Sequence, residues 1–360
     1  MPLFIYVDNI EKNIDYIKNR TNKKIMAVIK SDAYGIGALS IIKLLYEKVD
    51  YFVFEKYNEY LKCKDSLLTK KVLILESTYN YINDSNLRYS INSMIDVYNI
   101  RNISFPINVH FRVDTGMNRL GFRNINEFNF AYNMLRKNKN INIEGVYTHF
   151  SSDAFESKYF EKQKKQFKKI IKNKKFAIIH ANATRNINKE IIGNYIRIGI
   201  GMYGYHQPYF KLLRSVSLNS KVINVFNTSK NNKISYIQKS ENKKLIGIIN
   251  YGYNDVDLSK INYIYKKGQK YKLLGKSCMN HTHFYADDKI NYLSWLSILP
   301  TNGIIVDSKD YNFNIDWYAV LTSLKGLPKN YIRRSNYDIP KIFKYNGKES
   351  FKCRFRKRSC

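Results

Sequence analysis

The sequence predicts an α/β fold, in which a (β/α)8 barrel of the TIM type is followed by a mainly β domain. Two observations support this prediction. Over the first 212 residues, eight short apolar runs alternate with segments of helical spacing, as the strands and helices of a barrel do. After residue 212 the helical spacing stops, and short strand-like runs separated by turn residues follow. An open doubly wound sheet is the competing interpretation, which eight regularly alternating strands disfavour.

The eight candidate barrel strands are rich in β-branched residues, which is typical of buried parallel strands. Between them, Ile41, Ile42 and Leu45 place apolar side chains on one helical face. A second helical segment has Phe160, Phe167 and Ile171 on one face and the lysines of residues 158–172 on the other. The predicted strands are Ile25–Ile29, Tyr51–Phe54, Val72–Leu75, Tyr89–Ile91, Ile107–Val113, Ile143–Tyr147, Phe176–Ile179 and Tyr195–Ile198.

The change of pattern near residue 212 divides the chain into domains. We expect the barrel in residues 1–212, a β-rich domain in residues 213–335 and a basic tail in residues 336–360. The strand-like runs of the second domain are residues 220–227, 233–238, 244–253, 270–279, 281–286 and 303–308.

The net charge of +32 raises the question of a polyanionic partner. The lysines are scattered through every segment of the 360 residues rather than gathered in one block, which favours a general composition bias. The exception is the tail, where Phe351–Cys360 is locally basic and aromatic. We therefore expect no nucleic-acid partner, and a solvated terminus in the tail.

Composition also bears on the cellular setting. No apolar run approaches the roughly 20 residues that span a bilayer, and the N-terminus has no basic region typical of a secretory signal. The four cysteines show no CxxC or Cys/His spacing typical of metal ligands. These patterns predict a cytoplasmic protein with no membrane partner and no metal site.

Polar residues follow the predicted strands where a barrel holds its chemistry, at the carboxyl ends. Taken singly, a histidine or an arginine there is more often structural, but here several converge on one rim. The lysine of "AVIKSDAYGIG" ends the first strand and "VDTGMNRLGF" follows the fifth. The residues at or just after these strand ends are Lys30 and Tyr34, Arg119, His149, His180 and Thr184, and Arg197 with Gly199.

This set of residues fits pyridoxal phosphate. A barrel commonly holds a phosphate after strands seven and eight, where Thr184, Gly199 and Ile200 lie. Lys30, at the end of strand one, is placed to form a Schiff base with the cofactor's aldehyde. Arg197 is then the candidate partner of the ring nitrogen.

Seven motifs in order resemble the alanine racemase family over roughly residues 3–320. The family combines a barrel with a C-terminal β domain, and the resemblance implies an isomerase that interconverts L- and D-alanine with pyridoxal phosphate. It also implies that the enzyme is a homodimer and that its product, D-alanine, is used for the cell wall. The motifs are "AVIKSDAYGIG", "VDTGMNRLGF", "GVYTHFSSDA", "IRIGIGMYGY", "ISY", "GYNDV" and "GKSCMN".

The resemblance implies a role for each matching residue. Lys30 would hold the cofactor and serve as the base on one face of the substrate, and Tyr236, from the second subunit, would be the base on the other face. Arg197 would bind the pyridine nitrogen and His149 would link Arg197 to Tyr236. Arg119 would contact the cofactor and the substrate carboxylate. The remaining implied residues are Tyr34, Thr184, Gly199 and Ile200 for the phosphate, and Tyr253 and Met279 for the substrate.

The chain departs from the family pattern at several positions. Arg112 replaces a lysine that the family carbamylates, Ile237 follows the catalytic tyrosine in place of glycine, and Asn280 replaces an aspartate. Residues 318–331 lack a clear counterpart of the last phosphate-binding tyrosine. These departures leave open a racemase for serine or lysine, a basic amino-acid decarboxylase, which Arg197 disfavours, or a diverged protein that only binds the cofactor.

Overall fold

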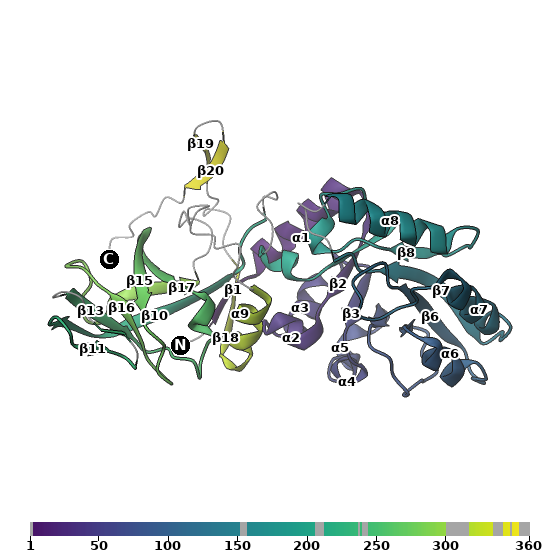
Figure 1. Ribbon diagram of the computed structural model, residues 1–360, viewed down its shortest axis with the longest axis horizontal. Helices are drawn as coiled ribbons and strands as arrows, with labels where there is room; N and C mark the ends of the chain where they lie inside the picture. Colours follow the sequence, from purple (N-terminus) through teal and green to yellow (C-terminus); the bar gives the residue numbers. More distant parts are fainter. Residues whose placement is uncertain are drawn as a thin grey trace. The chain divides into compact units, whose positions relative to one another are not determined.

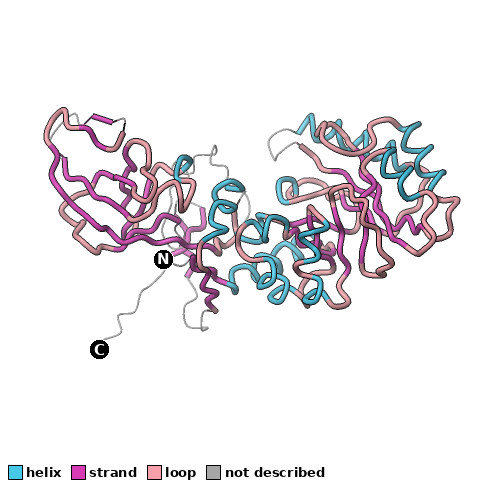
Figure 2. The backbone as a smooth tube through the Cα atoms, turned by 90° about the horizontal axis from the view of Figure 1, so that it is seen from below, coloured by secondary structure: helices cyan, strands magenta, loops and turns pink. Residues whose placement is uncertain are grey.

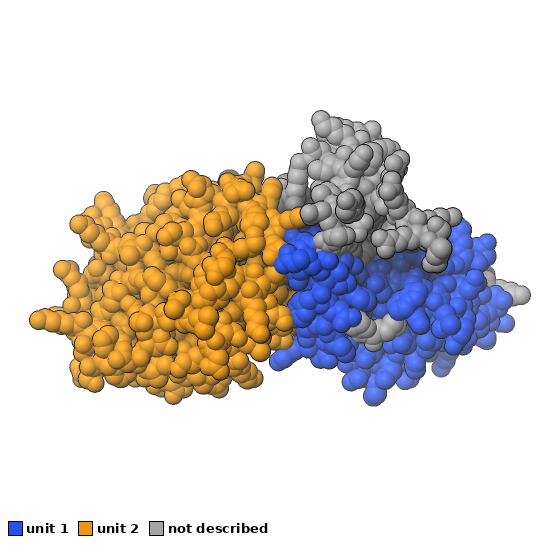
Figure 3. Space-filling view, turned by 180° about the vertical axis from the view of Figure 1, so that it is seen from behind, with its two compact units in different colours: residues 1–10, 213–360 blue, residues 11–212 orange. Residues whose placement is uncertain are grey.

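The computed structural model describes residues 3–151, 157–205, 212–236, 238–239, 244–299, 317–333, 341–345 and 348–352. The chain forms two compact units (Figure 3). One unit comprises residues 11–212, and the other combines residues 1–10 with residues 213–360. The expected boundary near residue 212 therefore separates the two units, whereas the first ten residues lie in the β-rich unit and not in the barrel.

The larger unit is built on an eight-stranded parallel sheet, which confirms the predicted barrel (Figure 1). The strand order is β8-β7-β6-β5-β4-β3-β2-β9, and an isolated parallel bridge between Ala183 and Arg197 joins the β8 and β9 edges. The strands are β2 (Lys24–Val28), β3 (Tyr51–Phe54), β4 (Lys71–Ile74), β5 (Leu87–Ile91), β6 (Ile107–Val113), β7 (Ile141–Thr148), β8 (Ile178–His180) and β9 (Tyr195–Ile198).

Helices follow most of these strands and cover them with one apolar face each. In helix α3 (Ala38–Leu45), the side chains of Ile41, Ile42 and Leu45 are completely buried, as the spacing of residues 41–45 predicts. The helices are α1 (Val7–Thr21), α2 (Lys30–Tyr34), α3 (Ala38–Leu45), α4 (Tyr57–Leu61), α5 (Lys64–Leu67), α6 (Met94–Ile100), α7 (Ile125–Leu135) and α8 (Ser157–Ile171), with the 3₁₀ turns η1 (Thr184–Asn186) and η2 (Ile200–Tyr203).

The second unit is mainly β, as the sequence predicts (Figure 2). Its main sheet has the order β13-β16-β15-β14-β17-β10-β1-β18. The long strand β10 also pairs with β13. The strands of this sheet are β1 (Leu3–Tyr6), β10 (Val216–Thr228), β13 (Lys244–Ile249), β14 (Tyr263–Lys266), β15 (Gln269–Leu274), β16 (Thr282–Tyr285), β17 (Trp295–Leu299) and β18 (Lys329–Ile332). The smaller elements are β11 (Lys233–Ile234), β12 (Gln238–Lys239), η3 (Leu258–Lys260), α9 (Trp317–Ser323) and η4 (Leu324–Gly326).

Strand β1 explains why the first residues belong to this unit. It pairs antiparallel with β10 and parallel with β18, and its Leu3 and Ile5 are fully buried. Both partners lie more than 200 residues further along the chain, so local patterns in the sequence do not reveal the pairing. Strands β14 and β17 are also absent from the prediction, and the predicted run 303–308 lies outside the described residues.

Of the basic tail, the structure describes only an antiparallel hairpin of β19 (Lys341–Tyr345) and β20 (Lys348–Lys352). The other residues of 336–360 lie outside the described part of the chain. Among the described residues, none of the helices combines the length and the apolar character that crossing a membrane requires.

Candidate active site at the carboxyl end of the barrel

Lys30 is the first residue of an unusual turn after β2. Residues 31–34 all have positive φ, between 52° and 61°, a left-handed conformation that costs L-residues roughly 1–2 kcal/mol each. Neighbouring groups compensate, since the Glu59 carboxylate accepts a hydrogen bond of 2.7 Å from the backbone N–H of Ser31. The turn carries Tyr34 into the protein, where it is buried, and leaves Lys30 partly exposed. Strain of this kind is concentrated at functional sites.

A carboxylate that the sequence analysis missed contacts Lys30. The Lys30 Nζ lies 2.7 Å from Glu55 Oε2, and each side chain is 30% exposed. Glu55 is the first residue after β3, so it occupies the same kind of position as the other candidate residues. Treating every polar residue at the carboxyl end of a predicted strand as a candidate site residue would therefore have included Glu55.

The four residues predicted to bind a phosphate come together after β8 and β9. A Cβ on Gly199 would lie 2.1 Å from the Tyr34 hydroxyl, so glycine is required for that hydroxyl to approach. The Gly199 N–H donates to Thr184 Oγ1 at 3.3 Å, and Ile200 begins the 3₁₀ turn η2. Two hydroxyls and the start of a 3₁₀ turn thus lie beside Gly199, and groups of this kind suit an anion.

Arg197 projects from β9 and is buried. Its guanidinium donates to the Nδ1 atom of His180 at 2.7 Å, to the carbonyl oxygen of Thr148 at 2.5 Å and to the carbonyl oxygen of His180. Burial and the nearby cations Arg112 and Arg119 lower the pKa of Arg197 to about 9. The group therefore remains a cation and a hydrogen-bond donor at neutral pH.

His149 lies among four cations of the same rim. Burial, together with Arg197, Arg119, Arg112 and Lys30, lowers the pKa of His149 well below its usual range. The histidine is therefore neutral near pH 7, and the surrounding positive charge favours an anion such as a phosphate or a carboxylate. The described contacts hold no hydrogen bond between His149 and Arg197. In this structure Arg197 instead bonds to His180, and both side chains are buried. The bridge between Ala183 and Arg197 brings the chain after β8 beside β9.

Arg112, which lies in β6, and Arg119, which follows β6, differ in exposure. Arg112 is only 4% exposed, and its guanidinium lies 5.6 Å from the centre of the Tyr147 ring. Arg119 is exposed, while the nearby Asp114 carboxylate pairs with Arg123 at 3.0 Å instead. Arg112 therefore adds a buried positive charge beside Arg197 at the position where the sequence departs from the family pattern.

The other three predicted residues lie in the β-rich unit, on loops that are tied to one another. The Tyr253 N–H donates to the Cys278 carbonyl oxygen at 3.1 Å, and the Ser235 hydroxyl donates to the Lys276 carbonyl oxygen at 2.5 Å. These loops expose large side chains to solvent. The exposed fraction is 73% for Tyr236, 57% for Tyr253 and 56% for Met279. Adjacent exposed apolar surface of this kind is typical of a protein interface.

Two of the departures lie near these loops. Asn280 follows Met279 and is exposed, and Ile237 lies outside the residues for which side chains are described. In the segment 318–331, Lys325 lies on the exposed turn η4. Its amine is therefore accessible to solvent in this unit.

The barrel residues fit pyridoxal phosphate on three grounds. Tyr34, Thr184 and Gly199 provide hydroxyls and an open approach for a phosphate. Arg197 is a buried hydrogen-bond donor, and the pyridine nitrogen of the cofactor can accept a hydrogen bond from it. Lys30 is a partly exposed amine at the same end of the barrel.

Comparisons with known proteins agree with this geometry. The family model for the alanine racemase N-terminal domain matches residues 5–207, and the model for the C-terminal domain matches residues 215–325. An alanine racemase from Fusobacterium nucleatum is 28% identical over 308 residues, which cover 78% of this chain and 85% of that protein. One from Borreliella burgdorferi is 30% identical over 328 residues, covering 78% and 82%. The crystal structure of an alanine racemase from Bartonella henselae with covalently bound pyridoxal phosphate has a TM-score of 0.79 at 20% identity, covering 92% and 99%.

Proposed function

This chain belongs to the alanine racemase family of isomerases, and we propose that it interconverts L- and D-alanine with the residues at the carboxyl end of its barrel and pyridoxal phosphate as cofactor. The observation that carries the proposal is the convergence of Lys30, Tyr34, Thr184 and Arg197 on one rim. Pyridoxal phosphate, when bound, withdraws electrons from the substrate and makes its Cα proton acidic.

Racemisation requires that a proton leave one face of Cα and return to the other, so two acid–base groups must flank the substrate. We assign these roles to Lys30 and to Tyr236. Lys30 also holds the cofactor covalently, for which its amine must first leave the carboxylate of Glu55.

The phosphate is held by the hydroxyls of Tyr34 and Thr184 and by the main chain at Gly199 and Ile200. Arg197 donates to the pyridine nitrogen, and because a guanidinium keeps its proton, that nitrogen stays largely unprotonated. The weaker electron withdrawal that results limits side reactions such as transamination. Arg119 and the other cations near His149 attract the carboxylate of the substrate.

We further propose a homodimer, in which Tyr236 of the partner subunit completes each site. The support is the exposure of Tyr236, Tyr253 and Met279 on loops joined by hydrogen bonds, since a symmetric partner would cover these side chains. We place this enzyme in the cytoplasm, where D-alanine is made for the cell wall.

The proposal is tested with the purified protein, loaded with pyridoxal phosphate. We expect a visible absorption band from the bound cofactor and conversion of L-alanine to D-alanine and of D-alanine to L-alanine. Lys30→Ala should lose both the band and the conversion, whereas Lys48→Ala, which removes a lysine paired with Asp15, should keep both. Turnover of serine or lysine but not of alanine would contradict the proposed substrate, and absence of the band would contradict the cofactor.

A further inference from the structure

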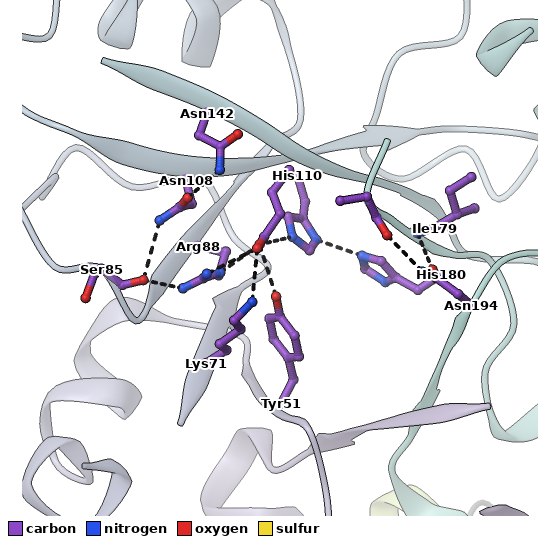
Figure 4. A network of polar contacts seen from close by, with 12 residues as sticks. Tyr51, Lys71, Ser85, Arg88, Asn108, His110, Asn142, Ile179, His180 and Asn194 are labelled. Carbon is purple, nitrogen blue, oxygen red and sulfur yellow. Dashed lines mark hydrogen bonds and ion pairs between the residues drawn. The ribbon is translucent and has the colours of Figure 1, made fainter. Parts of the chain in front are cut away.

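A continuous chain of hydrogen bonds runs from Arg197 away from the barrel rim, through two buried histidines, to Glu144. The Arg197 Nη1 atom lies 2.7 Å from His180 Nδ1. The His180 Nε2 atom lies 2.9 Å from His110 Nδ1, and the His110 Nε2 atom lies 3.2 Å from Glu144 Oε2. Figure 4 shows His110 between His180 on one side and Arg88, Lys71 and Tyr51 on the other.

The chemistry of its two ends gives this chain a single direction. The Glu144 carboxylate can only accept a hydrogen bond, so the proton of His110 lies on Nε2 and His110 Nδ1 is an acceptor. His180 Nε2 therefore donates to His110 Nδ1, which leaves His180 Nδ1 to accept from the Arg197 guanidinium, a group that can only donate. Both histidines are completely buried, and burial lowers the pKa of each below its usual range, so both are neutral.

The surroundings of Glu144 keep it a carboxylate. Arg88 donates to it at 2.7 and 3.2 Å, the Tyr51 hydroxyl donates at 3.0 Å and the Lys71 amine lies 3.3 Å away. Burial raises the pKa of Glu144, but its hydrogen bonds with His110 and Arg88 outweigh this effect and lower the pKa. At neutral pH the end of the chain is therefore an acceptor only.

We propose that Glu144 is a positioning residue for Arg197, acting through His110 and His180. The carboxylate selects the Nε2–H form of both rings, so that the lone pair of His180 Nδ1 faces the guanidinium and fixes its orientation. If His180 carried its proton on Nδ1, two N–H groups would face each other, and the guanidinium would turn away from Nδ1 and bond only to carbonyl oxygens such as those of His180 and Thr148. The inference rests on the role proposed above for Arg197.

A purely structural role for Glu144, as the counter-ion of Arg88, makes a different prediction. In that case the two imidazoles would keep their proton positions when Glu144 becomes neutral, provided that the protein folds. The proton positions of His110 and His180 therefore distinguish the two roles, and they can be measured in the cofactor-free protein.

The experiment is ¹⁵N NMR of the imidazole nitrogens in cofactor-free protein labelled at histidine. In the unmodified protein we expect both rings to be protonated at Nε2. In Glu144→Gln the side-chain amide can donate as well as accept, so we expect a mixture of the two tautomers at both rings. Asp15→Asn, which removes an exposed carboxylate paired with Lys48, is the matched control and should leave the spectrum unchanged.

A second variant tests the chain without disturbing the pair of Glu144 with Arg88. His110→Phe replaces one buried ring by another of similar size and removes the acceptor of His180 Nε2–H. We expect a mixed tautomer at His180. If the proton of His180 stays wholly on Nε2 in a folded His110→Phe protein and in folded Glu144→Gln, the proposal is overturned. Should Glu144→Gln not fold, His110→Phe decides alone.

The loaded enzyme provides a second readout. A misoriented Arg197 should reduce kcat for alanine by about tenfold while KM changes little, and should raise the share of turnovers that end in transamination. An unchanged partition between the two reactions in both variants would contradict the role at Arg197. The NMR result reports on the histidines even if alanine is not the substrate, so failure of the proposed function and failure of this inference are distinguishable.

Discussion

The amine of Lys30 forms an ion pair with the carboxylate of Glu55 across the ends of β2 and β3, with 2.7 Å between nitrogen and oxygen. Both side chains are 30% exposed, so water screens the pair and its contribution to stability is at most about 1 kcal/mol. Its effect is instead kinetic, because Lys30 must leave Glu55 before it attaches the cofactor.

Replacement of Glu55 by glutamine should therefore speed the covalent attachment of pyridoxal phosphate. Loss of a pair worth about 1 kcal/mol corresponds to an acceleration of up to about fivefold, with little change in the free energy of unfolding. The measurement is the growth of the visible absorption band after cofactor is added to cofactor-free protein. Asp15→Asn, which breaks the exposed pair with Lys48, is the control and should leave the rate unchanged. Equal rates in Glu55→Gln and the unmodified protein would contradict this role.

Gly199→Ala should weaken cofactor binding by displacing Tyr34. The new Cβ would lie 2.1 Å from the Tyr34 hydroxyl, which must move, and overpacking of this kind costs about 1–3 kcal/mol of stability. Equilibrium titration with pyridoxal phosphate measures the affinity, and urea denaturation measures the stability. Gly326→Ala is the matched control, because a Cβ there has no atom within 4 Å and both quantities should stay constant.

Thr184→Val should lower the affinity for pyridoxal phosphate by about tenfold, because the variant keeps the shape of the side chain but loses one hydroxyl of the proposed phosphate site. The KM for alanine, measured at saturating cofactor, should change much less. Thr228→Val, at a buried threonine of the β-rich unit, should alter neither value. A larger effect on KM than on cofactor affinity would place Thr184 at the substrate instead.

Buried neutral histidines, His110 and His180 among them, should make the protein less stable in mild acid. The pKa values of His110 and His180 are lowered by burial, so between those lowered values and about pH 6.5 the unfolded chain binds protons that the folded chain does not. The stability contributed by the neutral rings is therefore complete well above pH 6.5 and is lost as the pH falls below it.

Urea denaturation at pH 7.5 and at pH 5.0 tests this dependence. His110→Phe should lose less stability between the two conditions than the unmodified protein, because one of the buried neutral histidines is gone. His281→Gln changes an exposed histidine and should follow the unmodified protein. If the free energy of unfolding falls by the same amount in His110→Phe and in the unmodified protein between pH 7.5 and pH 5.0, His110 does not contribute to the pH dependence of stability.

The proposed shared active site predicts complementation between inactive variants. Lys30→Ala and Tyr236→Phe homodimers should each lack activity, whereas a mixed dimer contains one site with both groups intact. Mixing the two after subunit exchange should restore about a quarter of the unmodified activity, since half of the dimers are then mixed and each has one intact site of two. No recovery, despite proven exchange of subunits, would place Lys30 and Tyr236 of each site on the same chain.

The strands of the barrel could be located from the sequence because their signal is local. A parallel strand covered on both sides is a short run of apolar residues, and Tyr51–Phe54, Ile107–Val113 and Tyr195–Ile198 have the predicted bounds in the structure. Lys30, Tyr34 and Arg197 were candidates because the carboxyl ends of these strands meet at one rim.

What the sequence by itself determined is thus the fold class, the family and the residue types at the rim. The tertiary structure alone decided which of these groups touch. It shows that Lys30 forms an ion pair with Glu55 and that His180 rather than His149 is hydrogen-bonded to Arg197. It also shows that residues 1–10 lie in the β-rich unit and not in the barrel. The physical reason is that runs of apolar residues reflect burial along the chain, whereas hydrogen bonds and strand pairing depend on distances between segments far apart in it.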